Sequence, residues 1–287
     1  MASQQPRKIL RNKGIRPLKR LGQSFLEDKN VIRKIVDAAD LQRDDVVVEI
    51  GAGMGIMTEL VAAKAGRVVA LEIDPYMIPI LQGALTGRSN VEIVQTDVLK
   101  YDFSKPADEY RTDKLKIIGN VPYNISSQIL FHVLTFRNCI SSMLMMFQKE
   151  MADRIMASPG KKDYGIPSVL VNMYARISLE MSIPGTCFFP PPKVESSVLK
   201  FLIREKPCFA LADENIFAKV VKAAFSQRRK TILNNFRQSD LLDRSDRQAH
   251  LLLDHAEIDG QRRAETLSCE EYAKLANVLA KMAASSL

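Results

Sequence analysis

The segment VVVEIGAGMG (residues 46–55) constrains the fold of this 287-residue chain more than any other. Its β-branched run predicts a buried strand. Gly51, Gly53 and Gly55 follow directly, so the backbone can turn sharply and approach a ligand closely. The dinucleotide-binding pattern G-x-G-x-x-G would need glycine at position 56, which is Ile56. With Glu49 two residues ahead of the first glycine, the turn fits a nucleoside ligand that lacks phosphates.

Strand and helix patterns alternate through residues 30–157. β-branched runs predict strands, and apolar residues spaced three and four apart predict helices. The predicted strands are 45–50, 67–74, 91–97, 114–120 and 141–148, and the predicted helices are 30–40, 57–65, 75–85, 127–136 and 149–157. This alternation is typical of an α/β fold, a doubly wound, Rossmann-like parallel sheet with helices on both faces.

The pattern changes after about residue 205. Residues 215–236 and 269–283 have helical periodicity, with no clear strand pattern between them. We therefore expect three parts, which are a basic, flexible segment at 1–20, an α/β domain at 21–205 and a small all-helical domain at 206–287.

Positive charge is concentrated in two places. The chain carries 41 Lys and Arg against 33 Asp and Glu, a formal net charge of +8. Seven basic residues and no acidic residue precede Glu27, and the second cluster is Arg228-Arg229-Lys230. Clustered positive charge indicates a polyanionic partner such as nucleic acid. The alternative is a solvated tail and a solvated helix face.

Membrane, secreted and metal-binding classes are disfavoured. The sequence has no apolar run long enough to span a bilayer, and its basic start lacks the apolar core of a secretory signal. The four cysteines and three histidines are scattered, without metal-ligand spacing. We therefore expect reduced cysteines and no metal site in a cytoplasmic protein. We also expect a monomer, since no long apolar stripe is evident.

Two acidic residues stand at the ends of successive predicted strands. Glu72 ends the second strand, where a carboxylate can accept hydrogen bonds from both ribose hydroxyls. Asp97 follows the third, where it can accept from the exocyclic amine of an adenine in the crevice. Helix capping or a surface ion pair would also explain either acid alone, and NAD enzymes place an acid at the first position. The ordered set of glycine turn, Glu72 and Asp97 resembles class I methyltransferases that use S-adenosylmethionine (SAM).

The fourth strand ends in GNVPYNIS (119–126), which is similar to a motif of ribosomal RNA adenine N6-dimethyltransferases. Other matches to that family follow in order over nearly all of the chain after about residue 18. They are RLGQSFL (20–26), VEIGAGMGIMTEL (48–60), LEID (71–74), FQKEMADRI (147–155), YGIPSV (164–169), FFPPPKVESSV (188–198) and AFSQRRKTILNN (224–235). The resemblance implies dimethylation of two adjacent adenosines near the 3′ end of small-subunit rRNA, in a subunit that is not yet mature.

The residue types of this motif suit methyl transfer to an exocyclic amine. The amine lone pair is delocalised into the ring, so acceptors for its N–H groups would make the nitrogen a better nucleophile. Asn120 offers a side-chain carbonyl, and the backbone carbonyl beside Pro122 offers a second, whose direction the proline fixes. Tyr123 can stack on the base, and Phe188, or its neighbour Phe189, can cover the other face. The alternative is that Pro122 only ends a strand and Tyr123 packs beneath a loop.

The resemblance also assigns contacts to the methyl donor and to RNA. Ser24 and Leu26 would contact SAM with Gly51, Gly53, Glu72, Asp97 and Asn120, although related sequences usually carry Asn where this chain has Ser24. Lys19 and Arg20, and Arg228, Arg229 and Lys230 on a helix, would meet RNA phosphates. Adenine in a duplex cannot reach a deep cavity, so the target base must be single-stranded or flipped.

Three other functions remain open at this point. One is the related methyltransferase that modifies large-subunit rRNA and confers antibiotic resistance. Another is a ribosome-assembly factor of the same fold with reduced catalysis, although Glu72, Asp97 and Asn120 are intact. The third is an NAD-dependent oxidoreductase, which Ile56 and the Asn-Val-Pro-Tyr motif disfavour.

Overall fold

The structure, a computed structural model, describes residues 6–18, 21–242 and 244–284. The chain divides into two compact units. The first comprises the residues up to Ala152 together with Arg176–Ile203, and the second comprises Asp153–Ala175 together with the residues from Arg204 onward.

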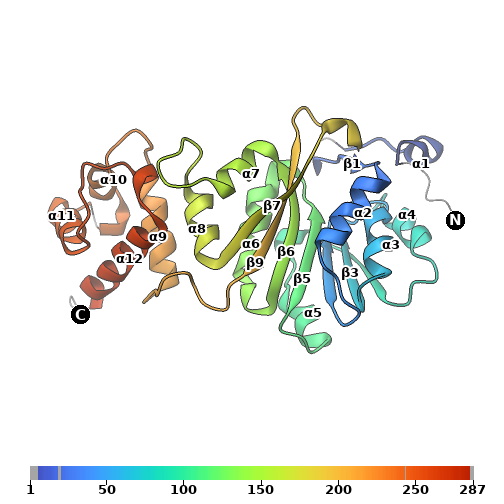
Figure 1. Cartoon of the computed structure of the whole chain (residues 1–287), viewed down its shortest axis with the longest axis horizontal. Coiled ribbons are helices and arrows are strands. Elements are labelled where there is room, and N and C mark those ends of the chain that lie inside the picture. The colour runs from blue at the N-terminus through green and yellow to red at the C-terminus, as the bar shows by residue number, and fades with distance from the viewer. Residues whose placement is uncertain (1–5, 19–20, 243, 285–287) are drawn as a thin grey trace. The chain divides into compact units, whose positions relative to one another are not determined.

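The first unit is built on a mixed sheet of seven strands with helices on both faces (Figure 1). The strand order is β4-β3-β2-β5-β6-β9-β7. Strands β2 to β6 pair in parallel, and β9 runs antiparallel to β6. The strands are β2 (Val46–Ile50), β3 (Arg67–Glu72), β4 (Val91–Gln95), β5 (Leu115–Asn120), β6 (Ile140–Gln148), β7 (Ala175–Ile183) and β9 (Ser196–Ile203). The expected parallel sheet is confirmed over its first five strands, and β9 adds an antiparallel member.

The strand order creates a crevice beside β2. The chain runs outward from β2 to β3 and β4, and then returns to place β5 on the other side of β2. Connections on either side of such a switch point diverge, which leaves a ligand site at the carboxyl ends of the strands. All five residues of β2 are buried, as its β-branched run predicts for a central strand.

Strands β2 and β5 approach each other closely at this crevice. Gly119 of β5 lies opposite Ile50 in the register. A Cβ atom on Gly119 would lie 2.9 Å from the carbonyl oxygen of Ile50, which is closer than real Cβ atoms come to an oxygen. Only glycine therefore fits at position 119 with this strand spacing.

Among the described helices of the first unit, the first and the fifth were not predicted, and the others follow the predicted alternation closely. The helices of this unit are α1 (Pro6–Lys13), α2 (Lys29–Ala38), α3 (Ile56–Ala62), α4 (Ile78–Ala84), α5 (Ser104–Glu109), α6 (Ser126–Thr135) and α7 (Lys149–Met156), the last of which crosses the unit boundary. Asp28 caps α2 by accepting hydrogen bonds from the backbone N–H groups of Asn30 and Val31. Such capping fixes where the helix begins.

Helix α1 differs from the expectation of a loosely held basic segment. Its Leu10 side chain is only 2% exposed and packs with Met54, Met77 and Ile80. Pro6 is buried as well, and Ile9 packs against the same cluster, so apolar contacts order this short helix despite its basic residues, because tertiary contacts contribute most of a helix's stability. Basic composition was a poor guide to order at this position.

The second unit is helical in the part of the chain that the structure describes. Its helices are α8 (Ile166–Tyr174), α9 (Glu214–Ala224), α10 (Ile232–Arg237), α11 (Asp246–His255) and α12 (Cys269–Ala284). Residues 215–236, predicted as one helix, form two, because the buried Asn235 side chain donates from Nδ2 to the carbonyl oxygens of Ala224 (2.5 Å) and Gln227 (3.2 Å). Those bonds satisfy carbonyls at the end of α9 and hold a turn there.

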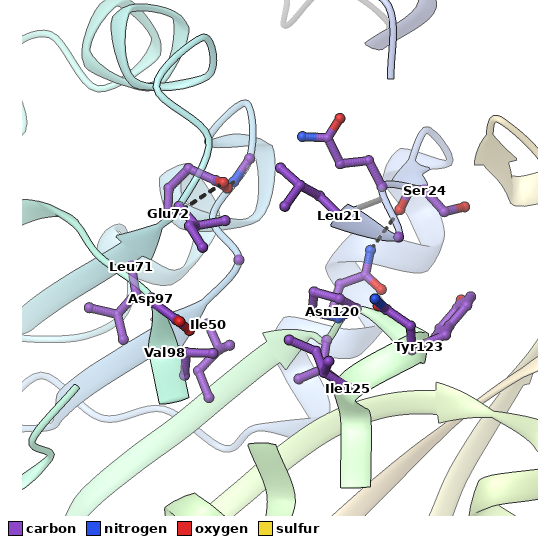
Figure 2. A pocket seen from close by; sticks show the side chains of 18 of the residues that line it. Leu21, Ser24, Ile50, Leu71, Glu72, Asp97, Val98, Asn120, Tyr123 and Ile125 are labelled. Atoms are coloured by element: carbon purple, nitrogen blue, oxygen red, sulfur yellow. Dashed lines mark hydrogen bonds between the residues drawn. The ribbon is translucent and has the colours of Figure 1, made fainter. Parts of the chain in front are cut away.

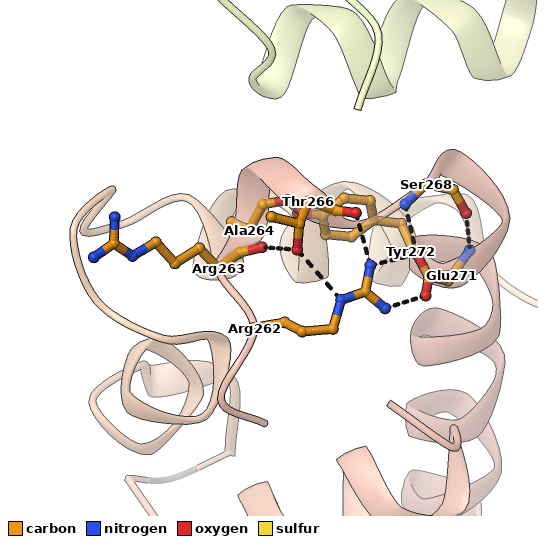
Figure 3. Close-up of polar contacts among 7 residues, drawn as sticks. All are labelled: Arg262, Arg263, Ala264, Thr266, Ser268, Glu271 and Tyr272. Atoms are coloured by element: carbon orange, nitrogen blue, oxygen red, sulfur yellow. Dashed lines mark hydrogen bonds and ion pairs between the residues drawn. The ribbon is translucent and has the colours of Figure 1, made fainter. Parts of the chain in front are cut away.

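A second polar cluster fixes the segment before α12 (Figure 3). Arg262 donates to both carboxylate oxygens of Glu271 and to the Thr266 carbonyl oxygen at 2.7 Å. The neighbouring Arg263 side chain points away from this cluster and is exposed. Arg262 therefore has a structural role, which leaves Arg263 as the outward-facing cation.

None of the helices within the described residues is both long and apolar enough to cross a bilayer. In the same part of the chain, no cluster of three or more potential metal-ligating side chains is found.

Candidate cofactor and substrate site

A cavity of about 210 Å³ lies at the carboxyl ends of β2, β3 and β5 (Figure 2). It brings together eight of the residues predicted from the sequence, namely Ser24, Gly51, Gly53, Glu72, Asp97, Asn120, Pro122 and Tyr123. These residues come from five separate stretches of the chain. Most of them converge because the parallel strands β2, β3, β4 and β5 all end at the same edge of the sheet.

Glu72 is held in place by backbone donors. Its Oε2 accepts from the Gly53 N–H at 2.7 Å, and its Oε1 accepts from the N–H groups of Ile73 (2.9 Å) and Asp74 (2.8 Å). Burial raises the pKa of Glu72, and the backbone hydrogen bonds partly offset that rise. The carboxylate is fixed against the glycine turn, and oxygen lone pairs remain for hydroxyl donors in the cavity.

Asp97 and an apolar slot form the neighbouring wall. The Asp97 Oδ1 accepts from the Leu99 N–H at 3.0 Å and so caps a short 3₁₀ helix, Val98–Lys100. The apolar lining beside it is Ile50, Leu71, Ile73, Val98 and Ile125. A flat base fits such a slot, and its exocyclic amine would meet the second Asp97 oxygen. Capping and ligand binding are compatible because they use different oxygens of one carboxylate.

Glu49 is a buried carboxyl in a smaller adjoining cavity, which also touches Gly51, Gly53 and Asn120. Its side chain is 1% exposed, and its Oε2 has no hydrogen-bond partner among the described residues. Burial raises the pKa of Glu49 to about 8, an effect that the Thr58 hydroxyl partly offsets and Glu72 reinforces. An unpaired buried carboxyl favours a cationic ligand, because the ligand's charge would repay the cost of ionisation.

Asn120 at the end of β5 has a defined orientation. Its Nδ2 donates to the backbone carbonyl oxygen of Ser24 at 2.9 Å (Figure 2). A carbonyl oxygen can only accept, so this contact assigns the amide nitrogen and directs Oδ1 away from Ser24. The side chain therefore keeps its carbonyl oxygen available as an acceptor.

Pro122 and Tyr123 continue the same wall. The Pro122 carbonyl oxygen accepts from the Ile125 N–H at 3.2 Å, which closes a short turn after the strand. The Tyr123 hydroxyl and the buried Ser196 hydroxyl lie 2.6 Å apart, so the ring is held at both ends. Burial raises the pKa of Tyr123, which keeps the phenol neutral at physiological pH.

Two predicted residues lie outside the main cavity. Leu26 and Phe188 pair across a two-stranded ribbon formed by β1 (Phe25–Leu26) and β8 (Phe188–Phe189). Phe188 is 2% exposed and packs in the main apolar core with Leu26, so it has no open face for a base. Phe189 is half-buried beneath the Arg7 guanidinium, 4.7 Å from its ring centre. The prediction that Phe188 covers the target base is therefore not supported by this arrangement.

The basic residues 228–230 lie in an exposed turn between α9 and α10, not on a helix as expected. Thr231, which follows them, pairs with Arg263 in an antiparallel bridge. The backbone of Arg263 therefore lies next to the end of this basic turn. Sequence reasoning missed Arg263, since it lies 33 positions beyond Lys230 (263 − 230) and has only one basic neighbour. Lys19 and Arg20 lie outside the described residues.

The fold and this cavity define a class of enzyme. A glycine turn after the central strand, an acid after each of the next two strands and an amide acceptor after β5 are the arrangement of a class I SAM-dependent methyltransferase. NAD binding is not favoured, because the third glycine of the pyrophosphate pattern is absent.

Comparison with known proteins identifies the family. The family model for ribosomal RNA adenine dimethylase matches residues 16–281. The ribosomal RNA small subunit methyltransferase A of Syntrophus aciditrophicus is 47% identical, over 95% of this chain and 98% of its own length. The protein of the same name from Moorella thermoacetica is 42% identical, over 94% and 95% respectively. The chain belongs to the ribosomal RNA adenine dimethylase family, and its methyl donor is SAM.

Solved structures support the same fold. A dimethyladenosine transferase from Plasmodium falciparum aligns with a TM-score of 0.76 at 24% identity, covering 88% of this chain and 95% of that one. The 23S rRNA methyltransferase ErmE aligns with a TM-score of 0.66 at 26% identity, covering 89% of this chain and 99% of that one. The expected class I methyltransferase fold is confirmed.

Proposed function

We infer that the chain, as a member of the rRNA adenine dimethylase family, dimethylates N6 of two adjacent adenosines near the 3′ end of small-subunit rRNA. The observation that carries the mechanism is the orientation of Asn120, whose amide nitrogen is bound by Ser24 so that Oδ1 can accept from a target amine. The choice of subunit is supported by the 47% identity to a small-subunit enzyme, against 26% to a 23S rRNA enzyme.

The donor set of the cavity fits SAM. Glu72 would accept from the ribose hydroxyls and Asp97 from the adenine amine. The unpaired Oε2 of Glu49 would face the cationic amino acid end of the ligand. Gly51 and Gly53, with φ angles of 74° and 55°, keep the turn free of side chains where the ligand would approach. When bound, SAM supplies an activated methyl group on a positively charged sulfur.

Asn120 and the backbone carbonyl beside Pro122 would accept the two N–H groups of the target amine. Those hydrogen bonds would turn the nitrogen toward tetrahedral geometry and free its lone pair for attack in line with the methyl group. Holding the reacting atoms in that alignment supplies much of the catalysis. No side-chain base is needed at the attack step, because the nitrogen becomes strongly acidic only after transfer and can then lose its proton.

Tyr123 would stack on the target base as a neutral ring, held by Ser196. Base–aromatic stacking contributes about 1–3 kcal/mol per base, enough to favour an extruded adenosine. The residue on the opposite face is not fixed by the present arrangement, since Phe188 is buried. A role for Phe188 would require the β1–β8 ribbon to move.

RNA contacts would come from exposed cations on both units. In the second unit these are Arg228, Arg229 and Arg263, with the half-buried Lys230 in the same turn as the first two. In the first unit, α1 presents Arg7, Lys8, Arg11 and Lys13 to solvent. These groups would bind backbone phosphates, so affinity for the rRNA should fall steeply with salt. Lys19 and Arg20, which lie outside the described residues, would add further phosphate contacts.

The finer biology is also part of this proposal. The chain would act in the cytoplasm as a monomer, on a small subunit whose assembly is incomplete. Sedimentation of the pure protein across a hundredfold range of concentration tests the monomer, and concentration-dependent mass would contradict it.

The decisive experiment uses labelled SAM and small ribosomal subunits that lack their adenine methyl groups. We expect label at two adjacent adenosines near the 3′ end, mapped by primer extension, and none on large-subunit rRNA. Label confined to the large subunit would support the antibiotic-resistance type instead. Stable subunit binding without label would point to an assembly factor.

A further inference from the structure

Residues 21–27 are called the strap from here on, and part of this segment forms a wall of the cavity. The first five, Leu21 to Phe25, line it. The far end of the strap is fixed by the pairing of Phe25 with Phe189 and by a hydrogen bond from the Glu27 N–H to the Cys187 carbonyl oxygen at 2.8 Å. The Ser24 hydroxyl adds a bond of 2.8 Å to the Pro190 carbonyl oxygen. At the near end, the Leu21 N–H donates to the Leu18 carbonyl oxygen at 3.0 Å, and the Gln23 side chain adds bonds to Leu18 and Asp74.

Gln23 bridges the strap to the cofactor side of the cavity. Its Oε1 accepts from the Leu18 N–H at 2.7 Å, and its Nε2 donates to the Asp74 Oδ2 at 2.6 Å. Asp74 is 1% exposed, and its other oxygen accepts from the Tyr76 N–H at 3.0 Å. A hydrogen bond to a buried carboxylate is stronger than one between neutral groups. The Gln23 contact is therefore a strong polar tie between the strap and the Asp74 turn.

The Asp74 turn is continuous with the predicted ribose acceptor. The Asp74 N–H donates to the Glu72 Oε1 at 2.8 Å, so the group that anchors Gln23 also orients Glu72. On its other side, the strap presents the Ser24 carbonyl oxygen to Asn120 at 2.9 Å. One short segment thus touches both the cofactor side and the amine acceptor. Moving it would disturb the two ends of the reaction together.

We propose that Gln23 is a positioning residue, whose hydrogen bond to Asp74 holds the strap so that the Ser24 carbonyl orients Asn120 for methyl transfer. This inference rests on the proposed function for the role of Asn120, while the effect of Gln23 on SAM binding stands apart from it. Gln23 itself touches neither reacting atom. Its contribution should therefore depend on the polarity of its bond to Asp74.

A polarity swap tests the bond. Gln23→Glu places two carboxylates against each other, and Asp74→Asn sets an amide donor against the Gln23 donor or against the Tyr76 N–H. In the double variant the new amide at 74 donates to the new carboxylate at 23. Leu18 and Tyr76 keep their acceptors, so every hydrogen bond is restored with its polarity reversed. Few merely structural roles would recover in this way.

The readouts are SAM affinity by equilibrium dialysis and the single-turnover methylation rate at saturating SAM and saturating subunit. We expect each single variant to lose about tenfold or more in both, the loss of one hydrogen bond to a charged group. The double variant should recover to within about threefold of the native chain. The matched control is Gln42→Glu, which sets a carboxylate against Asp40 in an exposed Gln–Asp contact of 3.3 Å away from the cavity and should change neither readout.

Three results would overturn the proposal. One is an unchanged single-turnover rate in Gln23→Glu at saturating SAM. Another is a double variant that stays folded, by thermal melting, yet fails to recover. If Asp74→Asn unfolds the chain, the test uses Gln23→Met, whose side chain has a similar length but no hydrogen-bond donor. An undiminished transfer rate in Gln23→Met would be the third contradicting result. If the native chain labels no rRNA adenosine, the proposed function fails, while the SAM affinities still report on the Gln23–Asp74 bond.

Discussion

The cavity in the first unit and the basic turn in the second are built in opposite ways. Around the cavity, each functional side chain is fixed by a buried or half-buried partner: Glu72 by three backbone N–H groups, Asn120 by Ser24 and Tyr123 by Ser196. In the turn at 228–230, order comes from Asn235 beneath it, and the arginines themselves extend into solvent.

The difference reflects what each region has to do. Methyl transfer depends on the alignment of a few atoms, so errors of a fraction of an ångström reduce the rate. Binding of an RNA backbone depends mainly on the number of phosphates neutralised, and long, solvated side chains can adapt to reach them. Substitutions should therefore have large, position-specific effects in the cavity and smaller, additive, salt-dependent effects in the turn.

The largest effect is expected at Asn120. Asn120→Ala removes an acceptor aimed at the target amine, and the single-turnover rate should fall by about 10²- to 10³-fold, as when one aligned group is lost from other active sites. SAM and subunit affinities should change by less than about threefold, since the contact forms mainly as the amine becomes tetrahedral. Asn120→Asp is the control, because it keeps an acceptor but loses the bond to Ser24. Its single-turnover rate should lie between the rates of the native chain and of Asn120→Ala. Rapid-quench assays with labelled SAM measure the rates, and normal turnover in Asn120→Ala would remove the basis of the mechanism.

Glu72→Gln should act on the cofactor alone. The substitution replaces a carboxylate that accepts three backbone hydrogen bonds, and we expect SAM affinity to fall about 10- to 100-fold. The methylation rate at saturating SAM should stay within about threefold, because Glu72 is distant from the amine acceptors along the cavity wall. Dialysis with labelled SAM checks the affinity. An equal loss in rate at saturation would mean that the cofactor and acceptor walls act as one unit.

Neutralising the basic turn should produce the salt-dependent class of effect. For Arg228→Gln with Arg229→Gln, we expect about tenfold weaker binding of the small subunit and a salt slope reduced by about 1.4, the value for two contacts to single-stranded RNA. SAM affinity should be unchanged. The matched control is Arg33→Gln with Lys34→Gln on the exposed face of α2. Filter binding at several salt concentrations makes the comparison, and equal losses in both pairs would mean that net charge matters rather than location.

The smallest effect concerns Glu49 and pH. Its pKa of about 8 means that roughly a tenth of the carboxyl is ionised at pH 7 in the free protein. A cationic ligand would lower that pKa, so binding should release a proton, and affinity should rise about fivefold between pH 7 and 8. In Glu49→Gln this part of the pH dependence should vanish. Calorimetry in buffers of different ionisation heat counts the protons, and equal release by the native chain and the variant would refute the assignment.

The sequence was a good guide wherever burial and chain order decide structure. Strands β2, β3, β5 and β6 were predictable because parallel strands covered on both faces are largely apolar, and the edge strand β4 was predictable from its β-branched residues. The convergence of Glu72, Asp97 and Asn120 followed, because the carboxyl ends of such strands meet at one edge. The β9 strand, antiparallel to its neighbour, has no signal for its direction in its own residues.

Other features depended on contacts between distant positions, which periodicity cannot show. The break between α9 and α10 arises from Asn235, whose side chain reaches back to Ala224. Helix α1 is ordered by Leu10 in a niche formed by Met54, Met77 and Ile80. Helices α8 and α11 were not predicted, since α8 is largely buried and lacks a polar stripe, and three of the four apolar residues of α11 fall in one run, Leu251–Leu253.

The same limit applies to single site residues. Phe188 lies in a motif that suggested a base-stacking ring, but its pairing with Leu26 across the ribbon buries it. In the sequence, Glu49 was notable only because it lies close to the glycine turn. That its Oε2 has no hydrogen-bond partner among the described residues depends on the packing around it, which the sequence does not show. Residue type indicates what a side chain can do, while packing decides which face remains open.

The close approach of β2 and β5 has a consequence for the reach of the enzyme. A single hydrogen atom on Gly119 sets the separation of the two central strands, since even a methyl group would press on the Ile50 carbonyl. One of these strands leads into the glycine turn and the other ends in Asn120. In the proposed mechanism, the distance between the methyl donor and the acceptor amine would therefore be set by two strand backbones in close contact. Side chains around the crevice would influence which RNA binds, but the distance that the methyl group travels would follow from the spacing of the two strands.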